Sequence, residues 1–464
     1  MRHSISGVFT LLGLVPALLL GCSGEDAPGA TAASPTFHRD VEPLLQKHCM
    51  SCHSPGNIAP FSLTTYDAAR SVANLVARST RERTMPPWGA QETDECEPPH
   101  GWKDDLRLTE AEIATFEAWA AAGSPEGDPA DAPAPFVPGA GGLAGVEMEI
   151  APKEPFVASG DADQFRCFVM DPGLSETRYL NGVHVLPGNS KVVHHALVFL
   201  DKEGASAELA DEQGGYDCFG GPGFAGELVA AWAPGGVPLE FEPNIGAEIP
   251  VGSRLVMQVH YHPAGTTAEP DTTRVQMRFT QGVPEYFMGV ALIGNFESAM
   301  EGGGGLLPGP NDGEGVEFMI PAGVSDHVET MQFRMPASLS ESEVYLYGAG
   351  THMHYVGKDM KITLAPEAPA AGEPAEQCLV QTPRWDFSWQ RGFYYDAPIA
   401  DLPRIRGGDL LTMRCTYDNT MSNPFLARAL KEQQIPAPVD VRLGESTLDE
   451  MCIAALIYVT KNPQ

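Results

Sequence analysis

The chain is poor in positive charge. Its 464 residues include 29 lysines and arginines against 61 aspartates and glutamates, which gives a formal net charge of -32. Nucleic acid and anionic lipid are bound by basic patches, so this imbalance argues against both as partners and favours cations or basic redox proteins. A simpler interpretation is that the acidity keeps an exported protein soluble.

Long apolar runs are also absent, apart from one at the N-terminus. The run from Ile5 to Leu20 follows Arg2 and His3 and is too short and too poorly flanked for a membrane span. It ends in Leu19-Leu20-Gly21-Cys22, which resembles the lipobox of bacterial lipoproteins. We therefore expect a signal peptide over residues 1–22, a lipid on Cys22 and a flexible tether over residues 23–34. An ordinary signal peptide with a chance cysteine is the alternative.

Export of this kind places the protein in the cell envelope. A lipid on Cys22 would be its only contact with a membrane, facing the periplasm or in the outer membrane. Disulfides persist in such an oxidising compartment. Apart from Cys22 and the two cysteines of the motif described below, six remain available: Cys96, Cys167, Cys218, Cys378, Cys415 and Cys452.

The patterning of the chain changes near residue 128. Helical patterns occur within residues 35–127, over Asp40–His48, Tyr66–Arg78 and Thr109–Ala122. The last begins with Thr109-Glu110-Ala111-Glu112, which is the spacing of a capping box. Residues 128–146 are a linker rich in Pro, Ala and Gly. Beyond it, strand patterns separated by turn residues predominate, and no internal repeat is visible. We therefore predict a mainly β protein, with two packed antiparallel, jelly-roll-like sandwiches over residues 147–285 and 286–464, after a small all-α unit.

A haem-attachment spacing lies in the helical part. Cys49-Met50-Ser51-Cys52-His53 is C-x-x-C-H, in which two thiols one turn apart can add to the haem vinyl groups. The histidine that follows is placed to ligate the iron. A lone disulfide or half of a zinc site would share the spacing, although no second cysteine pair nearby supports zinc.

The surroundings of this motif resemble small bacterial cytochrome c domains. Residues 37–45 resemble their opening, and residues 108–123 their closing helix. Their Met-Pro-Pro loop, which supplies the sixth ligand, matches Met85-Pro86-Pro87. The resemblance implies one haem c held by Cys49, Cys52, His53 and Met85, with its iron closed to O2 and suited to electron transfer. Met85 could instead be a packing residue; His48 and His100 are alternative ligands, which we expect at the surface.

Histidines after residue 146 gather in three sets. The sets are His194-His195, His260-Tyr261-His262 and His352-Met353-His354. Residues i and i+2 of a strand share a face, so His352 and His354 can converge on one metal. His194 and His195 point apart in a regular strand, so a shared metal needs a bulge or a strand end. Imidazole suits copper, zinc, iron and nickel, and the residues alone leave the metal open.

Six motifs in order resemble the copper type II ascorbate-dependent monooxygenases, the family of dopamine β-monooxygenase and peptidylglycine α-hydroxylating monooxygenase. The resemblance covers about residues 147–462. The motifs are Phe165-Arg166-Cys167, Val193-His194-His195-Ala196-Leu197, Leu255-Val256-Met257-Gln258-Val259-His260-Tyr261, Thr351-His352-Met353-His354, Gly408-Asp409-Leu410-Leu411 with Cys415, and Asp449-Glu450-Met451-Cys452.

The resemblance implies two copper ions per chain. His194, His195 and His260 would hold the electron-transfer copper, and His352, His354 and Met451 the catalytic copper that binds O2. A thioether is a soft ligand that favours Cu(I), the state that must meet O2. The same family pattern implies the disulfides Cys167–Cys218 and Cys415–Cys452. It leaves Cys96 and Cys378 either paired with each other or free.

The implied activity is hydroxylation of a C–H bond of a small organic substrate with O2. The second electron would cross a solvent-filled gap between the coppers. Ascorbate or a redox protein would supply electrons, with the fused haem as a possible relay. The family residues that grip a substrate carboxylate fall on Gly350 and Ala455, which favours an uncharged or apolar substrate. The alternative is a non-catalytic periplasmic lipoprotein that binds copper and transfers electrons.

Overall fold

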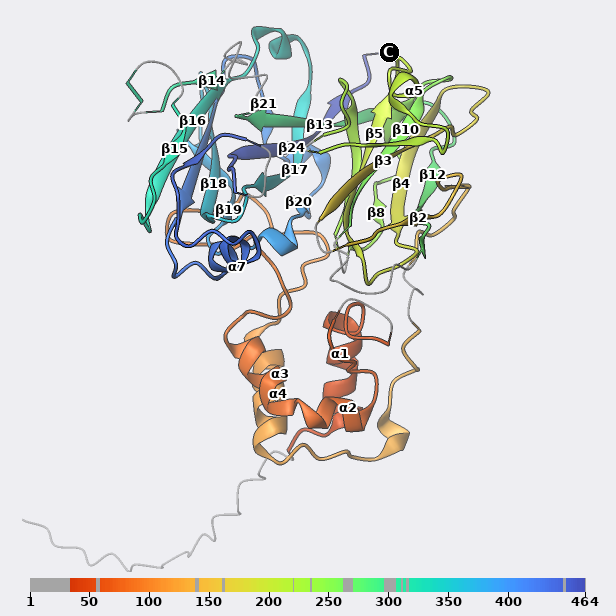
Figure 1. Ribbon diagram of the computed structural model, residues 1–464, viewed down its shortest axis with the longest axis vertical. Helices are drawn as coiled ribbons and strands as arrows, with labels where there is room; N and C mark the ends of the chain where they lie inside the picture. The colour runs from red at the N-terminus through yellow and green to blue at the C-terminus, as the bar shows by residue number, and fades with distance from the viewer. Residues whose placement is uncertain are drawn as a thin grey trace, which may run out of the picture.

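The computed structural model describes residues 34–55, 59–137, 142–160, 163–219, 221–233, 236–261, 270–295, 306–309, 312–313, 317–444 and 448–463. It is mainly β, with several antiparallel sheets, and its N-terminal helices lie below two side-by-side groups of strands in Figure 1. No helix in these ranges is long and apolar enough to cross a membrane. The predicted signal peptide, Cys22 and all but the last residue of the predicted tether lie outside the described residues.

The helical part precedes the strands. Its principal helices are α1 (Glu42–His48), α2 (Tyr66–Ser71), α3 (Ala73–Arg81) and α4 (Glu110–Ala121), with the short segments η1 (Phe37–Val41) and η2 (Pro129–Asp131). The capping box predicted for α4 is present. Thr109 Oγ1 accepts the Glu112 N–H, and the Glu112 carboxylate accepts the Thr109 N–H. The single helix predicted over Tyr66–Arg78 is wrong: Val72 leaves helical geometry and divides it in two.

One long sheet runs through the whole β part. Its neighbouring strands, in order, are β1 (Met148–Ile150), β12 (Arg274–Phe279), β4 (Arg178–Leu186), β9 (Ile245–Ile249), β13 (Tyr286–Gly294), β24 (Ile453–Lys461), β17 (Val344–His352) and β20 (Gly392–Tyr394). Strand β8 (Leu239–Glu240) also pairs with β4, and β21 (Arg404–Ile405) with β17. Since β13 pairs with both β9 and β24, the sheet continues across the boundary predicted between residues 285 and 286.

Two five-stranded sheets complete the β part. The first contains β6 (Gly215–Asp217), β3 (Gln164–Met170), β10 (Arg254–Tyr261), β5 (Val193–Asp201) and β7 (Glu227–Trp232). The second contains β14 (Leu306–Leu307), β16 (His327–Arg334), β22 (Leu410–Tyr417), β18 (Gly357–Ala365) and β19 (Gln377–Thr382). Two further pairs of short strands are β2 (Phe156–Val157) with β11 (Pro270–Asp271), and β15 (Met319–Ile320) with β23 (Val441–Arg442). The helical segments of this part are α5 (Ser206–Leu209), η3 (Ala337–Glu341), η4 (Phe387–Trp389), η5 (Ile399–Asp401) and α7 (Pro424–Glu432).

The sheets share one apolar core. Val183 of the long sheet and Val198 of the first small sheet belong to the same buried cluster as Leu346 and Met413 from the second half. Alternation along each strand produces this packing: β22, for example, buries every second residue. The β part is therefore built as facing antiparallel sheets, as in a β-sandwich.

A loop of the helical part packs on the β part rather than on its own helices. Ala90 and Trp102, which lie between α3 and α4, belong to the β core. The Gln91 N–H donates to the Gln381 carbonyl, and Cys96 forms a disulfide with Cys378. The pairing left open by the sequence thus ties the helical part to β19.

The two predicted disulfides are also present. Cys167 of β3 is bonded to Cys218, and Cys415 of β22 is bonded to Cys452 next to β24. Each bond connects a strand of one of the small sheets to a residue beside a metal-site motif. A disulfide of this kind contributes roughly 2–4 kcal/mol to stability.

Candidate metal centres

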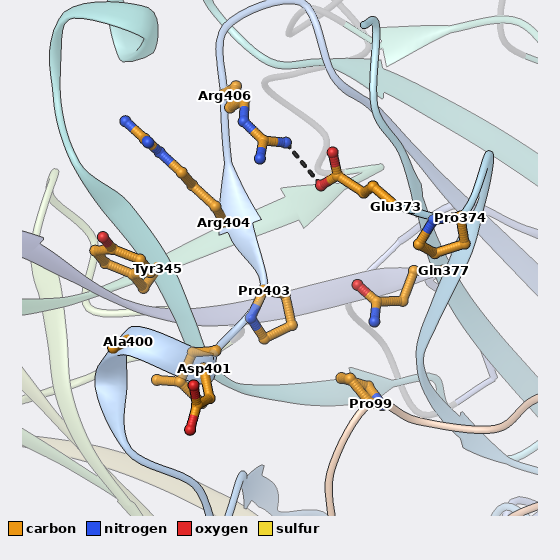
Figure 2. Close-up of a pocket in the computed structure, with 11 residues that line it drawn as sticks. Pro99, Tyr345, Glu373, Pro374, Gln377, Ala400, Asp401, Pro403, Arg404 and Arg406 are labelled. Carbon is orange, nitrogen blue, oxygen red and sulfur yellow. Dashed lines mark hydrogen bonds and ion pairs between the residues drawn. The ribbon is translucent and has the colours of Figure 1, made fainter. Parts of the chain in front are cut away.

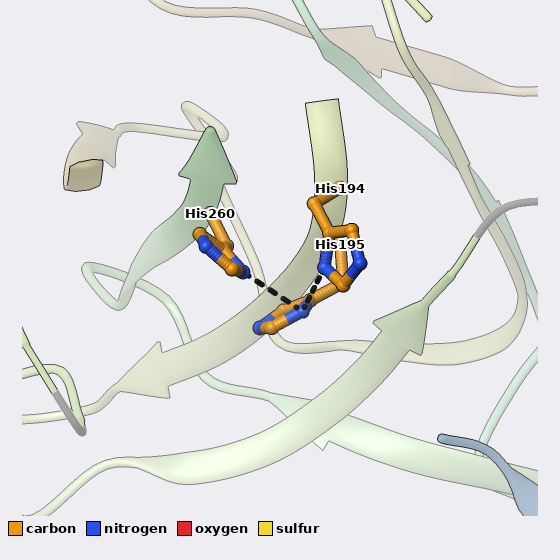
Figure 3. Close-up of side chains that lie close together, drawn as sticks. All are labelled: His194, His195 and His260. Carbon is orange, nitrogen blue, oxygen red and sulfur yellow. Dashed lines mark hydrogen bonds between the residues drawn. The ribbon is translucent and has the colours of Figure 1, made fainter. Parts of the chain in front are cut away.

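The first histidine cluster forms where β5 and β10 pair. His260 lies opposite His195, whereas Tyr261 lies opposite Val193, so His194 is an extra residue in a bulge. This is the distortion that the sequence predicted as necessary for adjacent histidines to face one metal. The three rings converge in Figure 3, with His195 Nδ1 3.3 Å from His194 Nδ1 and 3.4 Å from His260 Nδ1.

Two neighbours hold His260 in this cluster. The Phe165 ring stacks on it with centroids 4.2 Å apart and an interplanar angle of 9°. Asp163 Oδ2 lies 3.1 Å from His260 Nε2, on the side of the ring away from His195. This contact lacks hydrogen-bond geometry, so Asp163 acts on the ring as a nearby negative charge, while the Phe165 stack holds its plane. Burial, followed by the charges of His260 and His194, lowers the pKa of His195 well below its ordinary value, which favours the neutral, metal-binding form.

The second cluster forms where β17 ends and β24 begins. His352 pairs with Ile453 across these strands, which brings His354 and Met451 to the same edge. The His352 and His354 rings are 5.2 Å apart and nearly perpendicular, as expected for residues at i and i+2. Met451 is buried at 6% exposure. Its backbone is fixed because its N–H donates to Glu450 Oε1 and its carbonyl accepts the Tyr417 hydroxyl at 2.8 Å.

Each histidine of the second cluster contacts an oxygen acceptor of the protein through Nδ1. His354 Nδ1 lies 3.0 Å from the Asp449 carbonyl oxygen, so it donates to that oxygen. His352 Nδ1 lies 2.6 Å from Gln390 Oε1, and the Gln390 amide nitrogen donates to the Phe387 carbonyl, which orients the oxygen toward His352. Burial lowers the pKa of His352, so this ring is neutral near pH 7.

A fully buried carboxyl group accepts hydrogen bonds from the backbone of this site. Glu450 Oε1 accepts the backbone N–H groups of both His354 and Met451. Burial is the first cause that raises the pKa of Glu450 to about 8, although these N–H groups oppose it. The indole of Trp385 donates to the His354 carbonyl at 3.0 Å. The loop that carries His354 is therefore held from two directions.

One aromatic ring lies against both clusters. The Phe387 ring stacks at 6.4 Å on His194 and meets His354 edge-on at 6.1 Å. It also packs against Tyr355 at 4.6 Å. The gap expected between the two metal sites thus contains an apolar side chain, and His352 is near enough for its charge to act on His195.

The C-x-x-C-H motif forms the turn that follows α1. The His53 N–H donates to the Cys49 carbonyl at 2.8 Å, so Cys49, Cys52 and His53 share one turn. The two thiols are free, and burial raises the pKa of Cys49 to about 12. His53 Nδ1 lies 3.0 Å from the Phe61 carbonyl, which leaves Nε2 as a potential ligand. Two free thiols beside an imidazole with an available nitrogen fit covalent haem attachment.

Met85 lies in a different environment. It is 39% exposed and lines a cavity of about 300 Å³ with Trp88, Leu108 and Ile113, and the cavity lining does not include the motif. Its role as sixth ligand stays a prediction. Of the alternatives, His48 is buried and not at the surface, because its ring nitrogens contact the Leu106 carbonyl and Glu112. His100 contacts the Asp401 carbonyl, and His262 lies outside the described residues.

One groove of the structure lies away from the histidines. Its volume is about 430 Å³, and its lining includes Tyr345, Arg404 and the ion pair of Arg406 with Glu373, whose atoms are 2.8 Å apart (Figure 2). Tyr345 is the second residue of β17 and His352 is the last, seven residues apart along an extended strand, which is about 23 Å. None of the residues that line the groove belongs to either histidine cluster.

Sequence reasoning missed four residues that shape these sites: Asp163, Phe387, Gln390 and the buried carboxyl of Glu450. Glu450 adjoins Met451, and this adjacency was the one signal available. Nothing in the pattern around Phe387 or Gln390 distinguishes it from an ordinary surface loop. Only tertiary packing brings these side chains to the histidines.

No protein-family model matches this sequence, and no curated protein matches it. Among solved structures, the glycosylasparaginase PNGase F of Flavobacterium meningosepticum is similar over 68% of this chain and 96% of its own, with 9% identity and a TM-score of 0.25. The VP2 subviral particle of infectious bursal disease virus is similar over 68% and 81%, with 8% identity and a TM-score of 0.14. Similarities this low carry no argument, so function must be argued from the sites.

Proposed function

We propose that this chain is an exported copper-dependent monooxygenase with a covalently bound haem c, anchored to the cell envelope by a lipid on Cys22. Its finer architecture would be two jelly-roll-like sandwiches, each with one copper, after a cytochrome c-like domain. The reaction would convert a substrate C–H bond, O2, two electrons and two protons into an alcohol and water. Ascorbate or a redox protein would supply the electrons.

The observation that supports this proposal is the gathering of five imidazoles into two groups, with Met451 next to the strand that pairs with β17. Three imidazoles meet at the β5–β10 bulge: His194, His195 and His260. Two imidazoles and a thioether share the edge where β17 and β24 meet: His352, His354 and Met451. These residues are far apart in the sequence, and ordinary packing gives no reason to collect them. Imidazole with thioether is a donor set suited to copper cycling between Cu(I) and Cu(II).

The two sites would divide the chemistry. Bound copper would supply one-electron redox chemistry at the first site and reductive activation of O2 at the second. Gln390 and the Asp449 carbonyl hold the two imidazoles of the second site by Nδ1, so that Nε2 would be the nitrogen that binds copper. The Phe387 ring lies next to a histidine of each site.

The surface beside His352 supports an uncharged or apolar substrate. Gly350 pairs directly with Ala455, and Gly350 lies on the same strand face as His352. A Cβ built on Gly350 would lie 3.3 Å from the Arg391 carbonyl oxygen, so there is little room for a longer side chain. The Arg391 guanidinium is directed elsewhere, over the Trp88 ring. This patch therefore offers no cation to hold a substrate carboxylate.

Oxygen uptake tests the proposal. Copper-loaded protein is mixed with ascorbate or a reduced redox protein, labelled O2 and a panel of small uncharged compounds. The proposal predicts a hydroxylated product that carries the label. Met451→Leu should abolish product while copper remains at the first site, and Met421→Leu, which changes an exposed methionine, should not. Copper binding without O2 uptake under any reductant would instead indicate the non-catalytic copper-binding and electron-transfer lipoprotein.

A further inference from the structure

One short segment, residues 385–391, contacts histidines of both candidate copper sites and also the helical part that carries the haem motif. Its Trp385 indole donates to the His354 carbonyl, and its Phe387 ring lies against His194 and His354. Its Gln390 side chain is hydrogen-bonded to His352 at 2.6 Å. The next residue, Arg391, leaves the copper side and extends toward the helical part.

Arg391 connects this segment with the haem motif. Its guanidinium carbon lies 5.0 Å from the centre of the Trp88 ring, which belongs to the loop after Met85. Its charge also acts on the Cys52 thiol and opposes the rise in the pKa of that group, which is caused first by burial. Asp104 and Asp105 of the helical part face the same guanidinium and stabilise its charge.

The helical part is held against this segment by independent contacts. The Arg384 guanidinium donates to the carbonyls of Glu82 and Arg83, both at 3.2 Å. The Cys96–Cys378 disulfide and the Gln91–Gln381 hydrogen bond lie on the same side of the β part. These contacts keep the haem motif at a fixed distance from Gln390, so no encounter between free partners is needed.

We propose that an electron passes from a haem at Cys49, Cys52 and His53 to the copper site at His352 through Arg391 and Gln390, without visiting the His194, His195 and His260 cluster. This inference rests on the proposed function. The step oxidises one ferrous haem to ferric and reduces one cupric ion to cuprous; one electron crosses, and no bond or proton moves. The electron would reach the Arg391 side chain through space, and would then follow the Arg391–Gln390 peptide link, the Gln390 side chain and the 2.6 Å hydrogen bond to His352.

The contacts of this segment favour electron transfer from the haem to the second copper site rather than to the first. Electronic coupling falls less steeply along covalent bonds and hydrogen bonds than across van der Waals gaps. The route to His352 has a hydrogen bond, whereas the Phe387 ring of the segment and the His194 ring have their centroids 6.4 Å apart. The second copper site would therefore be reduced first.

Anaerobic stopped-flow spectroscopy tests this route. Protein with reduced haem is mixed with cupric ion, and haem oxidation is followed by absorbance while copper is counted by EPR. Arg391→Gln and Gln390→Leu should each slow haem oxidation about tenfold or more, a size typical of lost outer-shell contacts. Arg404→Gln is the control, because it removes an exposed guanidinium that is neither on the route nor among the contacts named above, and its rate should stay unchanged.

A further variant separates the two entry points. His260→Ala removes a ligand of the first cluster, and the proposal predicts that haem oxidation keeps its wild-type rate. Loss of oxidation in His260→Ala, or wild-type rates in both Arg391→Gln and Gln390→Leu with copper bound, would overturn the route while leaving the monooxygenase intact. A chain that binds neither haem nor a second copper would overturn the route and the proposed function together.

Discussion

The two histidine clusters are built in different ways. The first lies within a sheet, where strand register and one bulge bring His194, His195 and His260 together. The second lies at strand ends, where backbone bonds to Glu450 hold the loop around His354 and Met451. Register is spread over many hydrogen bonds, but at the second site one buried carboxyl group accepts the N–H groups of both His354 and Met451. We infer that the second site is the more easily broken by one substitution.

The largest effect is expected from Glu450→Ala. The N–H groups of His354 and Met451 would lose their acceptor in a buried place, which should lower the free energy of unfolding by about 2–4 kcal/mol. Copper should be lost from the second site and kept at the first, as measured by urea unfolding and EPR. Glu450→Gln keeps an acceptor oxygen and should retain both sites. Equal loss of copper from both sites in Glu450→Ala would contradict the proposed difference between the two sites.

Each of the disulfides Cys167–Cys218 and Cys415–Cys452 should stabilise the candidate copper site next to it. Replacing Cys167 and Cys218 by alanine should cost about 2–3 kcal/mol and weaken the first site, since the Cys218 carbonyl accepts Gln258 two residues before His260. Replacing Cys415 and Cys452 should cost a similar amount and disturb the second site instead, because Cys452 follows Met451. Calorimetry and EPR of the two double variants measure this, and interchanged effects would contradict the assignment.

A smaller, local effect is expected from Asp163→Asn. Loss of the carboxylate beside His260 Nε2 should lower copper affinity at the first site about tenfold, with the second site unchanged. Copper titration followed by EPR gives both affinities. Asp171→Asn, at the far end of the same sheet and paired with Arg254, is the control that should alter neither.

The smallest effect should come from a change remote from both clusters. Partial burial opposes ionisation of Glu112, but hydrogen bonds from Thr109 and Lys47 lower its pKa to about 2. The folded carboxyl therefore binds a proton more weakly than the unfolded one, so its stabilisation is present above pH 4.5 and is lost as the pH falls through about 2. Glu112→Gln should cost about 1 kcal/mol near neutral pH, after solvent screening, and nothing below pH 2. Urea unfolding at both pH values checks this, and any change in copper EPR would show that the clusters are not independent of the helical part.

The sequence predicted those features that depend on residues close together in the chain. The α4 capping box, the convergence of His352 with His354 and the need for a bulge at His194 follow from spacing along the chain. The mainly β character follows from turn residues and alternation. The family resemblance, not spacing, implied the disulfides Cys167–Cys218 and Cys415–Cys452, and both are present.

Long-range packing could not be predicted in this way. The Cys96–Cys378 bond spans 282 residues, and nothing near either cysteine indicates the other. His48 was expected at the surface, but Glu112 from a helix 64 positions away covers it. Phe387 reaches the histidines only because two sheets meet there. Such contacts depend on how the elements assemble.

Metal analysis with EPR on the purified full chain tests the central claim, that two separate copper sites and one haem occupy this protein. The account predicts two copper ions and one haem iron per chain, with one copper signal lost in His260→Ala and the other in Met451→Leu. A single copper per chain, or one signal that both substitutions abolish, would contradict it.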